Sequence, residues 1–85
     1  MKLPLIKHIV QFIDEHDEDY VDESLAVLEH LCDYTGIKDE EIDLLGEMIS
    51  NLYGALEVHR EMRKGVPQKE ALNNFMKRVQ GSIDL

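Results

Sequence analysis

The feature that most constrains the fold is a single long helical pattern over residues 38–64 of this 85-residue chain. Its beginning carries Asp39, Glu40 and Glu41, and its end carries Arg63 and Lys64, which is the arrangement of charges that a helix dipole favours. A helix of about 26 residues spans roughly 39 Å. Helices of about 12 to 15 residues reach only half as far, so several shorter elements have to cover it.

Three shorter helical patterns account for nearly all of the remaining chain. Apolar residues recur at helical spacing over residues 4–15, over residues that begin at 19 or 20 and end at 34, and over residues 67–80. No segment alternates apolar and polar residues as a strand does. The predicted loops are short, which places consecutive helices antiparallel or at a steep angle. We therefore predict an all-α fold, a small antiparallel four-helix bundle in one domain (residues 1–85), in which the third helix is the long central one.

Local signals predict where the helices begin and end. Asp19 is a suitable N-cap for the second helix, and Lys38 lies at the N-cap position of the third. Gly36 is expected to end the second helix in a left-handed conformation, and Gly81 is expected to end the fourth. The third helix should stop before Gly65.

The apolar residues of the long helix are spread too widely for a single neighbour. They cover about half of its circumference, which suits contact with two or more helices: Leu44, Leu45, Met48, Ile49, Leu52, Tyr53, Ala55, Leu56 and Met62. Two arrangements follow. Either the first and second helices cover its first half and the fourth covers its second half, or a second subunit covers the exposed part. We expect a homodimer formed through the third or the fourth helix.

A line of small residues follows the polar side of the long helix. Gly46, Ser50 and Gly54 are spaced four residues apart, and Val58 continues the same register. Glycine inside a helix costs roughly 1 kcal/mol relative to alanine, so two of them call for an explanation. One explanation is a docking strip for a helix from another subunit or protein. The other is that the pair of glycines is loosely tolerated, or that a neighbouring helix of the same chain packs closely against it.

The net charge of −9 argues against nucleic-acid binding, which needs clustered lysine and arginine. The charge is also uneven. Residues 1–56 carry 14 acids and 3 bases, a net of −11, whereas residues 57–85 carry 4 acids and 6 bases, a net of +2. This distribution is typical of ordinary solvated faces, but it also fits a molecule whose basic end meets an acidic surface on a second copy.

Cys32 is the only cysteine, so no disulfide can form within the chain. The chain shows no secretory signal and no apolar run long enough to cross a membrane, and a single cysteine fits a reducing compartment. We therefore expect a cytoplasmic protein without membrane contact. Cys32 lies in the apolar arc of the second helix, where a free cysteine usually acts as a small hydrophobe. It remains a candidate thiol, and an intermolecular disulfide is possible.

No catalytic or metal-binding motif is present in the sequence. None of His8, His16, His30 and His59 has an acid three residues before it, as a carboxylate-bridged bundle site requires. Nucleophile elbows, phosphate loops and dinucleotide fingerprints are also absent. The polar stretch around His59 is best explained by ion pairs within the helix, such as Glu57 with Arg60. We expect no enzymatic activity, no cofactor and no metal.

Three segments carry a resemblance: residues 2–8 (KLPLIKH), residues 43–58 (DLLGEMISNLYGALEV) and residues 71–77 (ALNNFMK). With them, most of the chain resembles an uncharacterised family of short acidic bacterial helical proteins. The resemblance implies no activity and no catalytic residues. Such proteins are associated with genes for thioredoxin and peroxiredoxin, which implies a cytoplasmic accessory role beside thiol redox enzymes.

Two functions follow as expectations. The first is a small helical interaction or regulatory protein that works as a homodimer and binds no nucleic acid. The second is an accessory protein to a thioredoxin/peroxiredoxin-type thiol system, which needs Cys32 or an acidic groove to be reachable.

Overall fold

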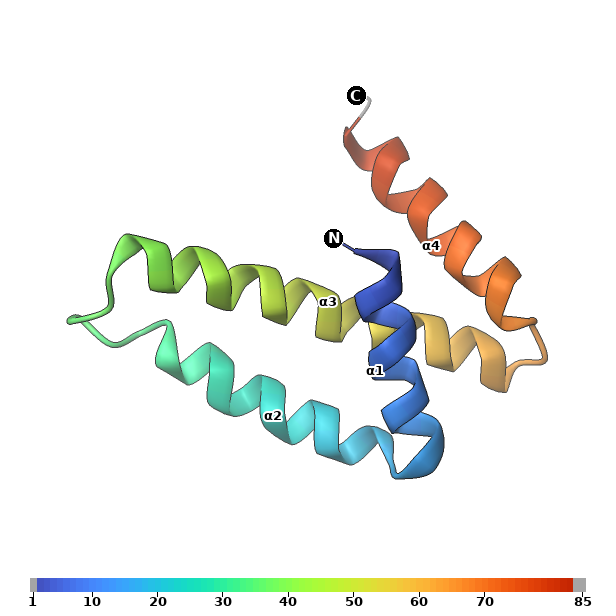
Figure 1. Ribbon diagram of the computed structural model, residues 1–85, viewed down its shortest axis with the longest axis horizontal. Coiled ribbons are helices and arrows are strands. Elements are labelled where there is room, and N and C mark those ends of the chain that lie inside the picture. The colour runs from blue at the N-terminus through green and yellow to red at the C-terminus, as the bar shows by residue number, and fades with distance from the viewer. Residues whose placement is uncertain (1, 84–85) are drawn as a thin grey trace.

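The structure is a computed structural model that describes residues 2–83, with the backbone alone for residues 81–83. Figure 1 shows four helices and, within the described residues, no strand: α1 (Leu3–Glu15), α2 (Glu18–Leu31), α3 (Asp39–Arg63) and α4 (Gln68–Ile83). The predicted all-α bundle with a long third helix is therefore confirmed.

α1 forms because its apolar residues recur on one side and because proline suits its first turn. Pro4 lies where a backbone N–H would have had no partner within the helix. Ile6, Val10 and Ile13 are spaced three and four residues apart, and all three are buried.

The beginning of α2 differs from the prediction. The N-cap is Asp17, whose side chain accepts a hydrogen bond from the backbone N–H of Asp19 at 3.0 Å. The sequence does not decide between Asp17 and Asp19, because aspartate is a good N-cap residue at either position.

The end of α2 also differs. The helix ends at Leu31, three residues before the predicted end, and Gly36 does not adopt the left-handed conformation expected of it. The ring of Tyr34 lies over Gly36 instead, and a Cβ at that glycine would stand 2.6 Å from the ring. Because Tyr34 is 67% exposed, its ring can move aside, and neither the contact nor the backbone angle requires a glycine at this position.

Both ends of α3 lie where the sequence predicts them. The backbone N–H of Lys38, the N-cap residue, donates to the Glu41 carboxylate at 2.9 Å. At the other end, the N–H groups of Gly65 and Val66 donate to the carbonyls of Met62 and Glu61. Gly65 has a φ of 99°, so α3 closes in a Schellman motif that needs glycine.

α4 extends beyond its predicted end. It begins at Gln68 and continues through Gly81 to Ile83. Gly81 therefore does not terminate the helix, because a glycine permits a left-handed turn without requiring one.

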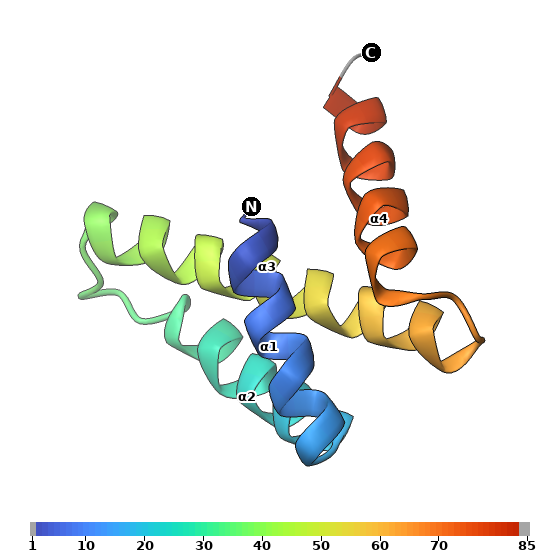
Figure 2. The ribbon, with the colours of Figure 1, turned by 45° about the vertical axis from the view of Figure 1, so that its right-hand side comes forward.

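Both views show α2 and α3 running antiparallel as a hairpin, with α1 crossing α3 and α4 rising away from it (Figures 1 and 2). α1 and α4 both lie on the second half of α3, contrary to the expected division between its two halves. The N–H of Lys2 bonds Asn51, and Asp14 contacts His59, while Phe75 packs at Gly54. The small residues of this stretch allow both helices to come close.

The core lies where α1, α2 and α4 meet α3. Its buried apolar members come from all four helices: Ile6, Val10, Ile13, Val21, Leu25, Ala55, Leu56, Val58, Ala71 and Phe75. The core residues from α3 all lie in its second half, so the first half of α3 contributes no buried apolar residue to the described core.

One buried polar residue fixes the position of α1. Asn51 has no exposed surface, and its Nδ2 donates to the carbonyl of Glu47 at 2.7 Å. Its Oδ1 accepts from the backbone N–H of Lys2 at 3.1 Å, which ties the beginning of α1 to the middle of α3. The sequence analysis missed this residue. The sequence does contain a sign of it: Asn51 is a single amide side chain among the apolar residues of the long helix, four residues before Ala55.

The molecule is flat. Its principal extents are 43 × 36 × 17 Å, and the shortest of these is less than two helix diameters. Its radius of gyration is 13.8 Å, against about 12 Å for a compact domain of this length. Every helix therefore has a side that no other part of the described chain covers.

Candidate functional site

The structure divides the predicted small-residue strip into two parts. Gly46 is exposed, and a Cβ added there would meet nothing within 4 Å. Ser50 is partly buried, whereas Gly54 and Val58 are buried inside the chain. Gly46 therefore stands apart, whereas Ser50, Gly54 and Val58 line one groove together. That the strip receives another chain stays a prediction.

Gly54 is needed by the chain's own packing. A Cβ at this position would lie 2.9 Å from Cζ of Phe75 on α4 and 3.1 Å from Cδ1 of Ile6 on α1. Both distances are shorter than ordinary van der Waals contact. The alternative of close packing within the chain is thus the correct one for Gly54.

A wide polar groove of about 800 Å³ lies between α3 and α4. Arg78 of α4 spans from one wall to the other, with its Nη2 2.6 Å and its Nε 3.2 Å from Oε2 of Glu57 on α3. The same guanidinium lies 5.7 Å from the centre of the Phe75 ring. These contacts hold α4 against α3. The remaining lining includes Ser50, Gly54 and Val58 of the predicted strip, together with Tyr53, Arg60, Glu61, Lys64, Ala71 and Asn74.

The groove shows no sign of a built polar site. Within the part of the chain whose side chains are described, every buried side-chain nitrogen and oxygen has a hydrogen-bond partner. Among the described residues that line the groove, no buried polar side-chain atom lacks a partner.

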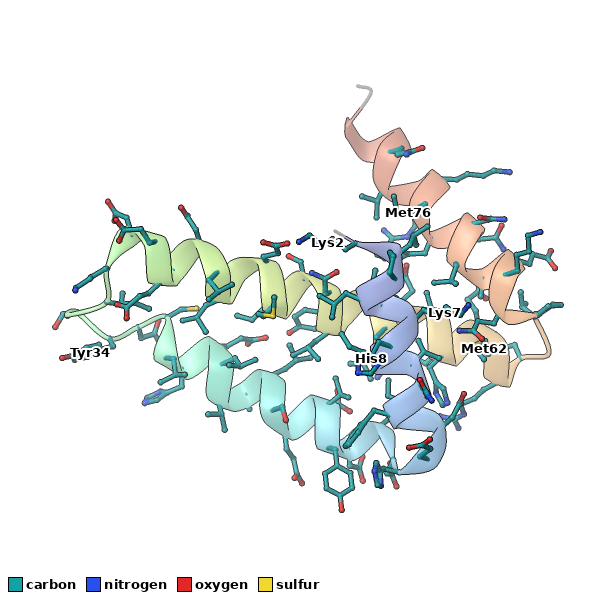
Figure 3. All side chains as sticks on the ribbon, viewed as in Figure 1. Lys2, Lys7, His8, Tyr34, Met62 and Met76 are labelled. Atoms are coloured by element: carbon teal, nitrogen blue, oxygen red, sulfur yellow. The ribbon has the colours of Figure 1, made fainter. Side chains whose placement is uncertain are left out.

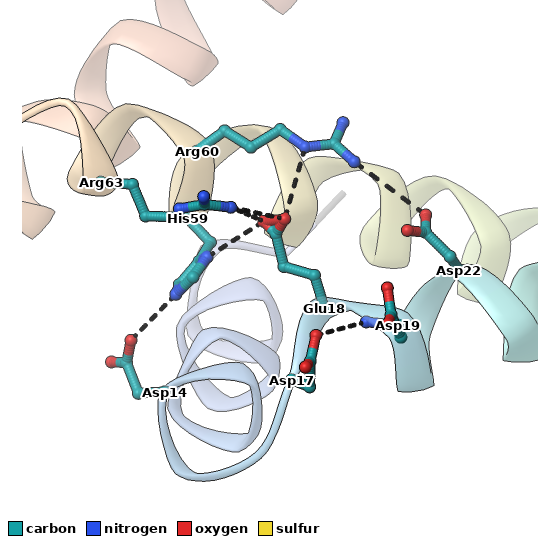
Figure 4. Close-up of polar contacts among 8 residues, drawn as sticks. All are labelled: Asp14, Asp17, Glu18, Asp19, Asp22, His59, Arg60 and Arg63. Atoms are coloured by element: carbon teal, nitrogen blue, oxygen red, sulfur yellow. Dashed lines mark hydrogen bonds and ion pairs between the residues drawn. The ribbon is translucent and has the colours of Figure 1, made fainter.

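A second polar cluster joins three helices around Glu18, the first residue of α2 (Figure 4). Its carboxylate accepts from Nη1 of Arg63 at 3.1 Å and lies 3.3 Å from Nδ1 of His59. Nε2 of the same imidazole lies 3.2 Å from Asp14 at the end of α1. The side chains of His59 and Glu18 are each only 13% exposed. The cluster fastens the turn between α1 and α2 to α3.

This cluster corrects one expectation from the sequence. Arg60 lies 3.7 Å from Glu18 and 4.0 Å from Asp22, and Glu57 pairs with Arg78, so the predicted pair between Glu57 and Arg60 is replaced by contacts between helices. The described residues contain no group of three or more histidine, cysteine or acidic side chains arranged to hold a metal ion.

Cys32 is partly buried at the C-terminal end of α2. Its Sγ lies 3.5 Å from the backbone carbonyl of Leu28, one turn earlier in the same helix. A thiol that donates back to its own helix behaves as part of the packing. Cys32 is not among the residues that line the groove between α3 and α4, where Ser50, Gly54 and Val58 lie.

The α2–α3 hairpin has an apolar side that α1 covers only at one end, and we call it the open face. It consists of Phe12, Tyr20, Val27, Leu31, Leu44, Leu45, Met48 and Leu52. On α2, Val27 and Leu31 follow Tyr20 in the same helical register and are 62% and 44% exposed. On α3, Leu44 is 59% exposed, and Met48 and Leu52 follow it at four-residue steps.

The inner end of the open face is hollowed where it meets α1. A notch of about 310 Å³ is lined by residues of α1, α2 and α3: His8, Ile9, Phe12, Tyr20, Val21, Ser24 and Leu52. Phe12 and Tyr20 make an edge-to-face ring contact with centroids 5.8 Å apart. Figure 3 shows His8 on α1 beside the hairpin and Tyr34 at the distant tip of the hairpin.

Acidic residues surround the open face. Glu40 and Glu41 lie one turn before Leu44, Glu47 lies one turn after it, and Glu23 lies one turn before Val27. The Glu47 carboxylate lies 3.8 Å from Nζ of Lys2, while Glu23, Glu40 and Glu41 are exposed. The surface is thus apolar at its centre and negative at its edge.

The sequence analysis missed the open face because it assigned all apolar residues of α2 to one arc. The structure divides that arc. Val21 and Leu25 are buried in the core, whereas Tyr20, Val27 and Leu31 are exposed. The width of the apolar arc of α2 could have indicated the open face, because the arc is wider than one neighbouring helix can cover.

With the geometry described, comparison with known protein families matches residues 1–84 to a family of unknown function. The chain belongs to this family, DUF6952. The resemblance to an uncharacterised family is thereby confirmed, and membership in DUF6952 assigns no activity. No curated protein and no solved structure shows significant similarity to this DUF6952 chain. In the part of the chain that the structure describes, every helix is too short or too polar to cross a membrane.

Proposed function

We propose that this chain is a small cytoplasmic helical interaction or regulatory protein that works as a homodimer and carries out no chemistry of its own. The observation that carries the proposal is the open face. Three of its large apolar side chains, Val27, Leu31 and Leu44, are 44–62% exposed on one side of a hairpin. Grouped exposure of this kind is typical of an interaction surface, whereas scattered exposure is not.

The accessible surface of the whole chain supports the same proposal. It is 6050 Å², whereas a compact monomer of 9.8 kDa is expected to expose roughly 5,200 Å². The difference, roughly 900 Å², is similar to the area of about 800 Å² that each partner buries in a stable interface. A second copy is a common way for a domain of this size to complete its core.

The test compares two variants that add the same charge to neighbouring positions of α2. Val27→Glu places a carboxylate on the open face, whereas Ala26→Glu places it on the exposed outer side of the helix. We expect the wild type and Ala26→Glu to sediment as dimers between 10 μM and 1 mM (roughly the range in which weak interfaces assemble) and Val27→Glu to sediment as a monomer. A wild-type protein that stays monomeric throughout this range would overturn the proposal.

The thiol accessory role stays a prediction, and its test is separate. It requires Cys32 to react in the native protein. Labelling by a thiol reagent at a rate close to that of the unfolded chain would support it, and protection of the native thiol would remove the version that depends on Cys32.

A further inference from the structure

We propose, building on the homodimer above, that the open face of one copy receives α4 of a second copy, in a two-fold symmetric exchange. The occupant is then a basic amphipathic helix that the chain itself supplies. Each copy contributes one acidic, apolar face and one helix, so the contact occurs twice in the dimer.

α4 is suited to this role by its position. Within the described residues, its substantial packing is with α3 alone, through Ala71 and Phe75. In both views it projects away from the other helices (Figures 1 and 2). The side of α4 that faces away from α3, here called its outer flank, is therefore accessible to a second molecule.

α4 is also suited by its chemistry. Leu72 and Met76 pack against the core cluster and are only partly buried, which leaves part of each side chain exposed at the edge of the outer flank. Lys69, Asn73 and Lys77 run beside them at four-residue steps, and all three are exposed. The flank therefore combines an apolar stripe with a basic edge, which complements the apolar centre and acidic edge of the open face.

The charge of the whole chain has the same pattern. Residues 1–56, which form the open face, carry a net charge of −11, and residues 57–85, which include α4, carry +2. Two copies that met through the same part of the chain, for example residues 1–56 of both, would bring like charges together and repel one another. Two copies that place α4 on the open face bring opposite charges together at both contacts.

The dimensions agree as well. α4 has 16 residues and is about 24 Å long. The part of α3 that precedes Asn51 is about 18 Å long, and α1 and α4 of the same chain pack beyond it. A helix of the length of α4 can therefore cover the open face from the notch to the tip of the hairpin.

The experiment reverses the charge of the basic edge of α4 in one variant and the charge of the acidic edge of the open face in another. One variant carries Lys69→Glu and Lys77→Glu in α4, and the other carries Glu23→Lys and Glu40→Lys at the edge of the open face. All four residues are exposed, so the fold of the monomer should survive, which circular dichroism checks. In the proposed dimer, either variant alone places like charges at both contacts. A mixture of the two places opposite charges at both.

We expect each variant alone to raise the dimer Kd roughly 30-fold to 100-fold at low salt. An equimolar mixture should form a heterodimer with nearly the wild-type Kd. Lys64→Glu is the charge control, because Lys64 lies in the groove on the other side of α3, and it should leave the Kd within about twofold.

The outcomes separate this inference from the homodimer itself. A wild-type dimer whose Kd is unchanged in both variants would overturn the pairing of α4 with the open face and leave the homodimer intact. Dimers that weaken in both variants but are not restored by mixing would show that the charges act within one chain. A monomeric wild type would overturn both proposals, and the open face would then be left to a basic helix of another protein.

A second measurement does not depend on charge. A spin label on Asn73→Cys, in a Cys32→Ser background, is mixed with isotope-labelled, unmodified protein that carries Cys32→Ser alone. We expect selective broadening of the methyl signals of Val27 and Leu44 in the labelled copy. Broadening confined to other residues would overturn the pairing.

Discussion

At the scale of single residues, two glycines of α3 have opposite surroundings. Gly54 stands within 2.9 Å of a ring atom of Phe75 once a Cβ is added, and Gly46 faces open space. Both occupy helix interiors, so alanine brings each the same gain in helix propensity. The difference between them isolates the contribution of packing.

Gly46→Ala should raise the free energy of unfolding by about 0.5–1 kcal/mol, because it removes backbone freedom from the unfolded chain without a clash. Gly54→Ala should lower it by about 1–2 kcal/mol, because Phe75 and Ile6 have to move away from the new methyl group. Urea unfolding of the two variants measures both values. An equal increase for both would contradict the tight packing at Gly54.

Tyr53 provides a prediction that depends on pH. Its hydroxyl donates a hydrogen bond to the carboxylate of Glu29, and this bond raises the pKa of Tyr53 above its ordinary value, with smaller contributions from desolvation and from the charges of Glu29 and Asp22. The protonated form is the one that makes the bond. Its stabilising effect is therefore present at neutral pH and is lost as the pH rises through the raised pKa.

Glu29→Gln should bring the pKa of Tyr53 back towards its ordinary value, because it removes both the charged acceptor and its electrostatic effect. The ultraviolet absorbance of tyrosinate, followed during an alkaline titration, measures the change. Glu23→Gln, on a different side of α2, is the matched control and should leave this titration unchanged. A titration unaltered by Glu29→Gln would contradict the bond.

At the scale of helices, Glu18 decides how firmly the turn between α1 and α2 is held to α3. Glu18→Gln should lower the free energy of unfolding by about 1–2 kcal/mol, because the carboxylate accepts from Arg63 and contacts His59 while only 13% exposed. Glu23→Gln, exposed on the same helix, should change it by no more than about 0.5 kcal/mol. Chemical denaturation compares the two, and equal effects would show that the cluster is not structural.

The helices could be predicted from the sequence to the extent that their signals are local. The ends of α3 were correct because caps and terminal charges act within one turn. Gly36 and Gly81 were assigned wrongly because glycine permits a left-handed turn without requiring one. Whether a helix stops there depends on neighbours that the local sequence does not contain.

The candidate site was less predictable for a related reason. Helical spacing identifies which residues of α2 are apolar, but it does not state which of them another helix covers. Val21 and Val27 both belong to the apolar arc of α2, about 120° apart at 100° per residue, yet one is 3% and the other 62% exposed. The same holds for Gly54, whose neighbours Ile6 and Phe75 come from the two ends of the chain.

At the scale of the whole molecule, the flat shape predicts a melting temperature that depends on protein concentration. If a second copy completes the core, mass action stabilises the folded dimer, and the Tm should rise by about 3–5 °C for each tenfold increase in concentration. Differential scanning calorimetry from 10 μM to 1 mM (roughly the same range of weak assembly) measures this dependence. Val27→Glu should show a constant Tm, and a constant Tm in the wild type would contradict the proposed assembly.

The close approach at Gly54 has a consequence for how the sequence can vary. Ile6 and Phe75 lie near the two termini, yet both occupy the space that a single absent methyl group leaves free. The effects of substitutions at the two positions should therefore not be additive. In the evolution of this family, a larger side chain at position 6 would be tolerated only alongside a smaller one at position 75, and the reverse.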